Sequence, residues 1–332
     1  MELKIGRNSL PEDIQLKMNS GNVFFSEGYS DYVEKSGGTM AYVYDNSFLL
    51  PVHICRKAGI RFATFPSEPL NLSASVITDY RTYLDDVCEC LKKQGITWVT
   101  SAASALFEYY PKKSLRIPFG SHILDLTLSE EQLFALMHSK HRNCVRRAEK
   151  SGVEIRSGGI ELLKDYVELD NATWLRNGRT SYGNKFFKDM VLSMNQNVVF
   201  YIAYKDEQPQ AGACFYCNDS MSYYMYGCSA DSPETGAANL LHWKAICDLK
   251  GKGVQKYSFV GCRINEDENS KYHTIQRFKE RFGGELVQGY MFKAILNPIK
   301  YKLFSLLYQF KNKAPLVDAV DQELEKWPEL NN

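Results

Sequence analysis

Residues 210–284 read QAGACFYCNDSMSYYMYGCSADSPETGAANLLHWKAICDLKGKGVQKYSFVGC, followed by a polar loop and then by YHTIQRFKERFGG. Two strand-like segments, Ala211–Cys217 and Met221–Ser229, stand on either side of Asn218-Asp219. Asn and Asp tolerate the backbone angles that tight turns need. The pattern therefore predicts a β-hairpin at the start of this stretch.

The rest of the stretch reads as helix, strand and helix. Apolar residues recur at helical spacing over Ala237–Lys250, and Gly251 follows as a stop signal. A short strand is expected at Lys256–Val260, and a last helix carries Phe278-Lys279 before Gly283-Gly284. Periodicity alone therefore predicts an α/β or α+β fold.

This order resembles the C-terminal half of the FemAB-type peptidoglycan bridge-forming aminoacyltransferases and their acyltransferase relatives, which are built on the GNAT fold. The matching pieces are the Gln-Ala-Gly strand opening, the Tyr-Tyr strand, the Asn-Leu-Leu-His-Trp-Lys-Ala-Ile helix, the Phe-Val-Gly strand end and Phe-Lys-Glu-Arg-Phe-Gly-Gly. The resemblance is clearest from about Ser139 to Lys293 and fades in the first half.

The resemblance implies an α+β (α/β) fold of two GNAT-like lobes, each a mixed, mainly antiparallel sheet flanked by helices. It places a degenerate GNAT-like lobe at 1–135 and the acyltransferase lobe at 136–332, with a cleft between them. A length of 332 residues fits two domains of ordinary size.

The charge and the cysteine content limit which classes of function the protein can have. Forty basic and 39 acidic residues give a net charge of +1, which argues against polyanion binding along the whole chain but leaves local basic patches open. We expect no signal peptide and no membrane span, because no suitable apolar run is present. Nine scattered cysteines then indicate reduced thiols and a cytoplasmic location. Cys214-x-x-Cys217 has no second pair at zinc-site spacing, so no metal site is expected.

The first half mixes strands with one long helix. A hairpin is expected over Thr39–Pro51 and a helix over Val76–Gln94. The resemblance places a substrate-contacting lysine just before the first hairpin, where this chain has Lys35. The alternative is an exposed lysine at a helix end.

A strongly basic helix is expected at Ser139–Ser151. Arg142, Arg146 and Lys150 are four residues apart and therefore share one face. Because arginine offers a planar, permanently charged fork, this face can bind a phosphate-bearing substrate. The alternative is a solvated face with salt bridges to Glu149 or Glu154.

A second arginine-rich segment follows the next helix. The resemblance implies an Arg-rich loop before an aromatic helix start, and Arg176, Arg179 and Tyr182 match it by position. These residues could bind an anion or simply tie the loop to the surface. Tyr224 and Tyr226 could line an acyl or aminoacyl tunnel, although aromatic residues are common in strands.

The resemblance places a lysine near the reaction centre at Lys279. Such a lysine can neutralise substrate charge or stabilise the oxyanion that forms when an amine attacks an ester. The alternative is a lysine that faces solvent. His242 and His273 are candidate bases, although a lone histidine is more often a packed or surface residue.

The donor is expected to be aminoacyl-tRNA or acyl-CoA, with no tightly bound cofactor. Ser229–Gly236 leads onto a helix N-terminus, where free N–H groups favour a pyrophosphate or the acceptor end of a nucleic acid. The acetyl-CoA signature of the GNAT fold is only partly imitated here by Pro233, Gly236 and Ala237.

The C-terminal region is predicted to hold an apolar, basic helix at Pro298–Lys311. Such a helix packs against its own domain or makes peripheral membrane contact over 298–311. The acidic tail after Pro315 is expected to be loosely held.

The function expected from all of this is acyl or aminoacyl transfer to a cell-envelope precursor of peptidoglycan or polysaccharide. The acceptor attacks the activated ester directly, and no covalent-catalysis motif argues otherwise. The acceptor is expected to be phosphorylated, and tRNA is a candidate partner. The alternatives are an acyl-CoA-dependent N-acetyltransferase of polysaccharide biosynthesis and a non-catalytic binding protein that kept the fold.

Overall fold

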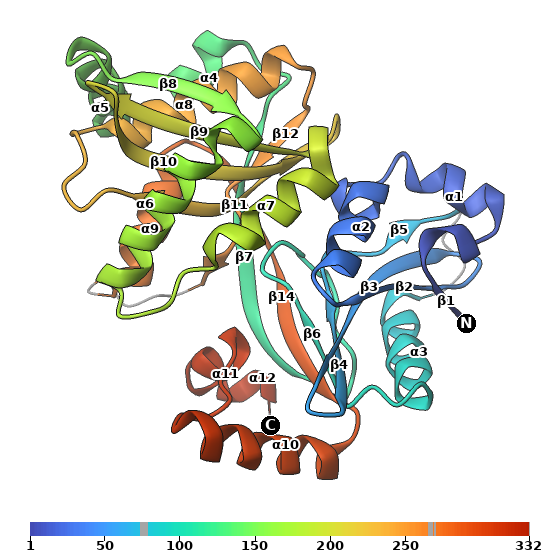
Figure 1. Ribbon diagram of the computed structural model, residues 1–332. Coiled ribbons are helices and arrows are strands. Elements are labelled where there is room, and N and C mark those ends of the chain that lie inside the picture. The colour runs from blue at the N-terminus through green and yellow to red at the C-terminus, as the bar shows by residue number, and fades with distance from the viewer. Residues whose placement is uncertain (74–78, 265–267, 269, 332) are drawn as a thin grey trace. The chain divides into compact units, whose positions relative to one another are not determined.

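The structure is a computed structural model that describes residues 1–73, 79–264, 268 and 270–331 (Figure 1). The chain forms two compact units. Unit 1 comprises Met1–Phe25, Gly37–Gly120 and Gln288–Asn332, and unit 2 comprises Ser26–Ser36 and Ser121–Val287. Each unit contains strands and helices, as the predicted mixed fold class requires.

This division differs from the expected boundary between residues 135 and 136. The strands β7 (Leu115–Asp125) and β14 (Glu285–Ile295) each run from one unit into the other. The second half of β14 pairs with β6 in unit 1, so residues 288–332 return to the first unit. The order of elements along the sequence does not predict that the C-terminal segment joins the first unit.

Unit 1 is built on a mostly antiparallel sheet in the order β1-β2-β3-β4-β6-β14, in which only β4 and β6 pair in parallel. Its core joins one face of these strands to the apolar stripe of α3. The elements before β14 are β1 (Glu2–Ile5), α1 (Glu12–Met18), β2 (Thr39–Tyr44), β3 (Phe48–Lys57), β4 (Ile60–Phe65), β5 (Leu70–Asn71), α3 (Tyr80–Lys93) and β6 (Trp98–Ser101).

The predicted hairpin over Thr39–Pro51 is confirmed as β2 and β3. The predicted helix over Val76–Gln94 begins at Tyr80, because the Asp79 side chain accepts a hydrogen bond from the Thr82 N–H and caps it. Residues 76–78 of that prediction lie outside the described residues.

The C-terminal segment of unit 1 is packed, so the expectation of a loosely held tail is wrong. After β14 come α10 (Pro298–Asn312), α11 (Ala319–Glu323) and α12 (Pro328–Asn331). The Lys293 side chain of β14 is buried, and its amine forms ion pairs with Asp318 at 3.1 Å and with Asp321. Val320 is 1% exposed. A buried lysine needs counter-charges, and the acidic tail supplies them.

Unit 2 contains a sheet in the order β7-β12-β11-β10-β9-β8, in which β11 and β12 are parallel and the other pairs are antiparallel. Its strands are the second part of β7 together with β8 (Glu154–Gly158), β9 (Val198–Lys205), β10 (Gln208–Cys217), β11 (Met221–Ser229), β12 (Lys256–Ser258) and β13 (Cys262–Arg263). The predicted hairpin around Asn218-Asp219 is confirmed as β10 and β11.

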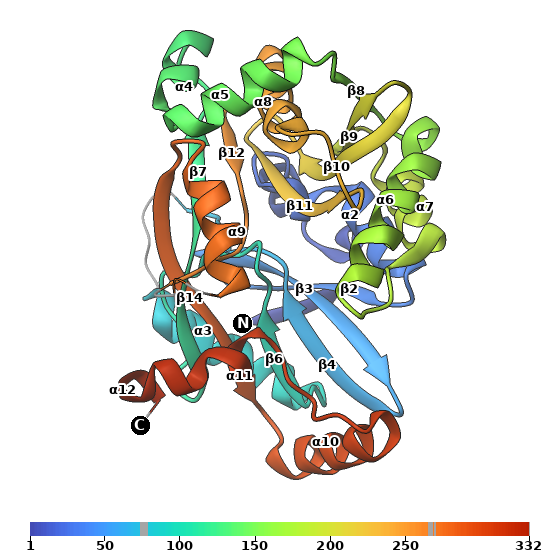
Figure 2. The ribbon, with the colours of Figure 1, turned by 90° about the vertical axis from the view of Figure 1, so that its left-hand side faces the viewer.

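Helices cover both faces of this sheet (Figures 1 and 2). The core on one face joins α5 and α8 to the strands, and α6 and α7 pack on the other face. The helices are α2 (Glu27–Lys35), α4 (Glu130–Leu136), α5 (Ser139–Lys150), α6 (Leu163–Arg176), α7 (Gly183–Met194), α8 (Ala237–Gly251) and α9 (Lys271–Glu280). The last seven residues of β10 are buried, as expected for a strand covered on both faces.

In the described ranges, no helix combines the length and the apolar character that crossing a bilayer requires.

Candidate functional site

The strand β11 carries the irregularity around which the site is built. Tyr226 lies opposite Cys214 and Tyr224 lies opposite Phe215, so Met225 is an extra residue and forms a β-bulge. On its other side, β11 pairs with β12 only over Met221–Tyr223. The rest of β11, up to Ser229, has β10 on one side and no paired strand on the other within the described part of the chain.

The strands β11 and β12 therefore diverge inside the sheet after Tyr223 (Figure 2). An unpaired strand edge offers a row of backbone N–H and C=O groups. Such an edge is suited to an extended ligand that carries amides of its own. We call residues 224–229 the open edge.

The bulge sends the two predicted tyrosines to opposite faces of the sheet. The Tyr224 ring lies 4.5 Å from the ring of His242 on α8. The Tyr226 ring lies 5.2 Å from the ring of Tyr182, beside α7. In a regular strand, residues two apart share a face, so the inserted Met225 is the reason for the separation. The two tyrosines therefore do not line one common tunnel wall.

Lys279 does not face solvent. Its aliphatic stem is only partly covered, but its amine is buried and donates hydrogen bonds to Gly261 O at 2.9 Å and to Val260 O. Burial lowers the pKa of the amine to about 8, and the charge of nearby Cys262 opposes that shift. A lysine ammonium has three N–H groups, so one of the three is not used by these carbonyls.

The carbonyls that Lys279 holds belong to a strained turn. Val260 has a φ of 46°, which is rare for a β-branched residue. Its N–H donates to Ser258 Oγ at 3.3 Å. Strain of this kind persists only when the surroundings hold it, and it concentrates at functional sites. The turn directly follows β12, and the neighbouring Phe259 ring lies 6.4 Å from the Tyr224 ring.

The two histidine candidates differ in burial. The His242 side chain is buried, and its Nδ1 lies 2.6 Å from the Tyr257 hydroxyl. Burial, together with the charges of Lys279 and His141, lowers the pKa of His242 to about 3. It is therefore neutral and enclosed at neutral pH, which does not suit a general base. His273 is half-buried and lies in the first turn of α9, and Ser270 caps the N-terminus of that helix.

Sequence reasoning did not single out Asp170 on α6. Its side chain is 2% exposed, and its Oδ1 accepts a hydrogen bond from Trp174 Nε1 at 3.0 Å. Burial raises the pKa of this carboxyl, and hydrogen bonds from Trp174 and the Tyr182 backbone oppose the rise. The available signal was an acid among the buried positions Leu163 and Tyr166 of one helical stripe.

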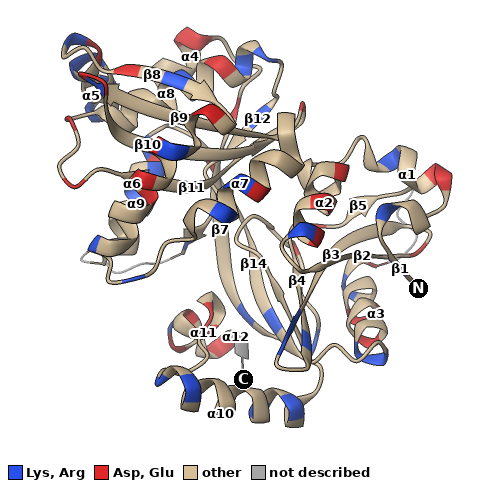
Figure 3. Ribbon diagram, viewed as in Figure 1, with Lys and Arg blue, Asp and Glu red and all other residues tan. Residues whose placement is uncertain are grey.

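The helix α5 is rich in basic residues (Figure 3), and two of its arginines contact neighbouring residues of α4. Arg142 donates to Ala135 O at 3.0 Å and to Met137 O, at the carboxyl end of α4. The Arg146 guanidinium lies 5.3 Å from the Phe134 ring. The predicted alternative partners are engaged elsewhere, since Glu149 pairs with Lys244 at 3.2 Å and Glu154 with Arg156 at 3.6 Å.

We expect an Arg142→Gln variant to lose about 1–2 kcal/mol of folding stability, because carbonyls at the end of α4 lose a charged donor. The matched control is Arg147→Gln, on an exposed position of the same helix. Chemical denaturation of both variants provides the measurement. Equal stabilities for the two variants would show that the contacts of Arg142 contribute nothing to the fold.

The second arginine segment lies on the α7 face. Arg176 donates to Ser229 O at 3.0 Å and to Asp231 at 2.6 Å, which ties it to the end of β11. Arg179 is exposed, and its guanidinium has no hydrogen bond or ion pair with any residue of the described ranges. Tyr182 is 46% exposed, next to Tyr226. The structure therefore brings Arg176, Tyr182 and Tyr226 together at one side of the open edge.

Lys35 lies on α2 and pairs with Asp189 of α7 at 3.8 Å. Its side chain is 45% exposed. This contact is compatible with the alternative of a surface lysine at a helix end, and a role in substrate binding stays a prediction.

The N-terminus of α8 begins at Gly236, which has a φ of 86° and no side-chain cap. A Cβ atom at this position would lie 2.3 Å from Cys144 O, so only glycine fits here. The α5 backbone thus approaches the start of α8 closely, next to the segment predicted to receive a pyrophosphate.

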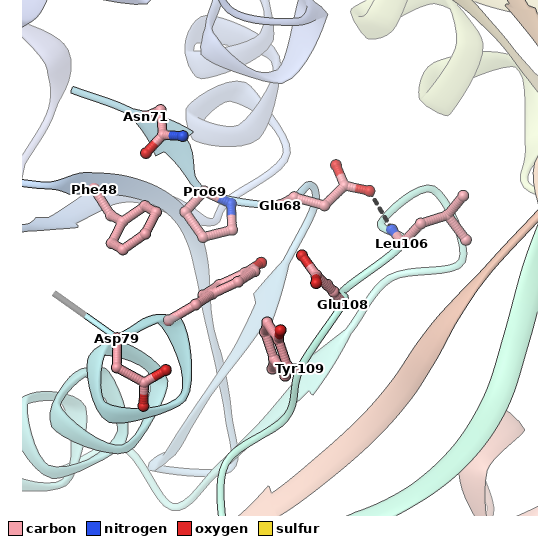
Figure 4. Close-up of a pocket in the computed structure, with 9 residues that line it drawn as sticks. Phe48, Glu68, Pro69, Asn71, Asp79, Leu106, Glu108 and Tyr109 are labelled. Carbon is pink, nitrogen blue, oxygen red and sulfur yellow. Dashed lines mark hydrogen bonds between the residues drawn. The ribbon is translucent and has the colours of Figure 1, made fainter. Parts of the chain in front are cut away.

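Unit 1 has a cavity of about 490 Å³ that contains none of the predicted site residues (Figure 4). Glu68 accepts a hydrogen bond from the Leu106 N–H, and burial raises the pKa of its carboxyl. Asp79, Glu108 and Tyr109 also line the cavity. The predicted residues all belong to unit 2.

The region that contains this site is similar to a known protein family. Residues 137–279 match the acetyltransferase (GNAT) domain family. The chain thus contains a region similar to this domain. This region includes β11 with its bulge, α8 and the strained turn, and Lys279 is its last matched residue. No curated protein sequence matches the chain.

Solved structures extend the likeness to both units. FemX is 14% identical, with a TM-score of 0.65 over 91% of this chain and 99% of the FemX chain. L-PGS from Bacillus licheniformis is 14% identical, with a TM-score of 0.56 over 92% of this chain and 97% of its own. The C-terminal domain of a putative lysylphosphatidylglycerol synthetase from Agrobacterium fabrum is 12% identical, with a TM-score of 0.57 over 89% and 96%. The fold is thus the two-lobed GNAT-like fold that the sequence predicted.

Proposed function

We propose that the protein is an acyltransferase that transfers an acyl or aminoacyl group to an amine or hydroxyl of a cell-envelope precursor. The observation that carries the proposal is the open edge of β11 inside the matched GNAT domain. FemX and lysylphosphatidylglycerol synthetase share the fold over most of the chain and support an acceptor from the cell envelope.

The open edge provides a place for the donor. The pantetheine arm of an acyl-CoA contains two amides and can pair with the backbone groups of residues 224–228 that the chain leaves unused. Tyr226 O and both backbone groups of Ser229 already bind side chains of α6. The phosphate-bearing end of either donor would then bind at the N-terminus of α8, where backbone N–H groups and the helix dipole favour negative charge. The same edge can also hold the peptide-like end of an aminoacyl donor.

The chemistry proposed is direct attack. The acceptor's nitrogen or oxygen attacks the carbonyl carbon of the activated ester, and the bond to the donor's thiol or ribose oxygen breaks as the proton of the acceptor passes to solvent or to a base. The unused N–H of Lys279 would stabilise the oxyanion. Burial raises the pKa of Cys262 to about 11, which does not favour a thiolate nucleophile.

Arg179 and Tyr182 are the residues we assign to the acceptor. Arg142 and Arg176 already donate hydrogen bonds to carbonyl groups of the protein itself, so we do not assign them to the phosphate of the acceptor. Arg179 is exposed and its guanidinium is available to a phosphate.

We expect a charged tRNA to bind and its affinity to fall steeply with salt, because phosphate contacts release counterions. The helix α5 supports this donor, since it has five basic residues and one acidic residue in the segment SKHRNCVRRAEK. Lys140→Gln/Arg146→Gln/Arg147→Gln should weaken binding and flatten its salt dependence. Lys112→Gln/Lys113→Gln, in exposed positions of unit 1, serves as the control.

The competing donor gives a different result in the same titration. Saturable micromolar binding of acetyl-CoA, with a mild salt dependence and no tRNA binding, would assign the chain to N-acetyl transfer instead. Binding of either donor without its consumption in the presence of envelope precursors would leave only a binding protein.

A further inference from the structure

The helix α10 in unit 1 has two apolar sides, and only one of them is packed. Phe304 is 5% exposed, and its ring lies 5.3 Å from the Trp98 ring. Tyr301 approaches the same tryptophan ring at 5.3 Å. These contacts fix the orientation of the helix on unit 1.

The other apolar side faces solvent. Its exposed fractions range from 56% to 90%, with Phe310 the most exposed and Ile299 next at 83%. At about 100° of rotation per residue, the side covers an arc of about 100° around the helix axis. The residues of this outer stripe are Ile299, Leu303, Leu306, Leu307 and Phe310.

Lysines border the outer stripe on both sides. By the same rotation, Lys300 and Lys311 fall on one border and Lys302 on the other, and Lys313 follows at the end of the helix. These lysines are exposed and form no ion pair with residues of the described ranges. The segment Pro298–Asn312 contains no acidic residue.

We propose that the outer stripe of α10 docks on a membrane surface that contains anionic lipid. Apolar side chains at the centre of the stripe enter the boundary between headgroups and acyl chains, and the lysines on its borders meet the anionic headgroups. This surface goes beyond the proposed transfer reaction, and it requires neither donor nor acceptor.

The charge pattern separates this occupant from a second copy of the chain. Two outer stripes packed against each other would bring lysines against lysines, and juxtaposed like charges oppose association. A nucleic acid would engage the lysines but would leave the exposed leucines and phenylalanine in water. An anionic bilayer satisfies the apolar centre and the basic borders together.

The test is sedimentation with vesicles of equal parts phosphatidylglycerol and phosphatidylcholine. Wild-type protein is expected to bind, and Ile299→Ser/Phe310→Ser to bind about a hundredfold more weakly, because two exposed apolar side chains no longer insert. The fold should be unaffected, since both side chains are almost fully exposed. The matched control is Leu16→Ser/Leu192→Ser, whose leucines are 64% and 53% exposed on other helices.

A second variant, Lys300→Gln/Lys302→Gln/Lys311→Gln, tests the headgroup contacts. Each lysine near an anionic surface contributes about a fivefold gain in affinity, so the triple variant is expected to lose about a hundredfold. Vesicles of phosphatidylcholine alone should bind the wild type weakly. The proposal is overturned if wild type and Ile299→Ser/Phe310→Ser bind equally, or if that variant instead abolishes a dimer seen by analytical ultracentrifugation. The assay contains no acyl donor, so its failure leaves the proposed transferase activity standing.

Discussion

A Lys279→Met variant is expected to lose turnover by about a hundredfold or more, the scale of removing one preorganised donor to an oxyanion. It is also expected to lose about 1–3 kcal/mol of stability, because Val260 O and Gly261 O lose their buried donor. Turnover should therefore be measured well below the melting temperature of the variant.

The control is Lys188→Met, an exposed position of α7. It should leave turnover and stability unchanged. Turnover of Lys279→Met at the level of this control would remove Lys279 from the reaction. A parallel loss of turnover and of folded fraction would make its role purely structural.

The pH dependence distinguishes the charged amine from the neutral one. Because the pKa of Lys279 is about 8 in the folded chain and 10.5 for an ordinary lysine, the unfolded chain binds more protons between these values. The stability of the wild type should therefore rise relative to Lys279→Met as the pH increases from about 8 to 10. If the ammonium stabilises the oxyanion, turnover should fall as the pH rises through about 8. Turnover that rises there would assign the neutral amine instead.

The second large effect concerns the packed tail. Asp318→Asn/Asp321→Asn is expected to destabilise the protein by about 3–5 kcal/mol, because Lys293 would remain buried without a counter-charge. Burial alone would lower the pKa of Lys293, but the hydrogen bond to Asp321 and the charges of both aspartates raise it. Denaturant unfolding followed by circular dichroism measures the loss.

Two further variants make this test specific. Glu325→Gln removes a charge from an exposed position of the same tail and should cost little. Adding Lys293→Met to the double variant should recover much of the lost stability, because no buried charge then lacks a partner. Unchanged stability of Asp318→Asn/Asp321→Asn would mean that the tail is held loosely after all.

The unit 2 elements that the sequence predicted well are those with strong local patterns. The hairpin around Asn218-Asp219 and the helix from Ala237 follow from turn chemistry and helical periodicity, and both are present. The strand β1 (Glu2–Ile5) was missed, because its alternating run of only four residues is short and its formation depends on pairing with β2.

The unpredicted features arise from contacts between distant segments. The sequence Tyr224-Met225-Tyr226 does not predict a bulge, since the inserted residue is defined only by the register with β10. The acids of the tail look like solvated charges until Lys293 is found buried in β14.

In the candidate site, too, local sequence indicated individual residues but not their contacts with distant segments. A resemblance in Phe-Lys-Glu-Arg-Phe-Gly-Gly pointed to Lys279, but its carbonyl partners lie 18 and 19 residues away in the chain. Arg142 was a reasonable phosphate ligand by spacing, and only the folded chain reveals its contacts with the end of α4.

The most direct test of the proposed activity is mass spectrometry of envelope precursors incubated with the protein and a donor, either charged tRNA or acyl-CoA. One precursor is expected to gain the mass of a single acyl or aminoacyl group with wild-type protein, and to do so at least a hundredfold more slowly with Lys279→Met. If no precursor gains mass with either donor while both proteins remain folded, the chain is not the transferase proposed.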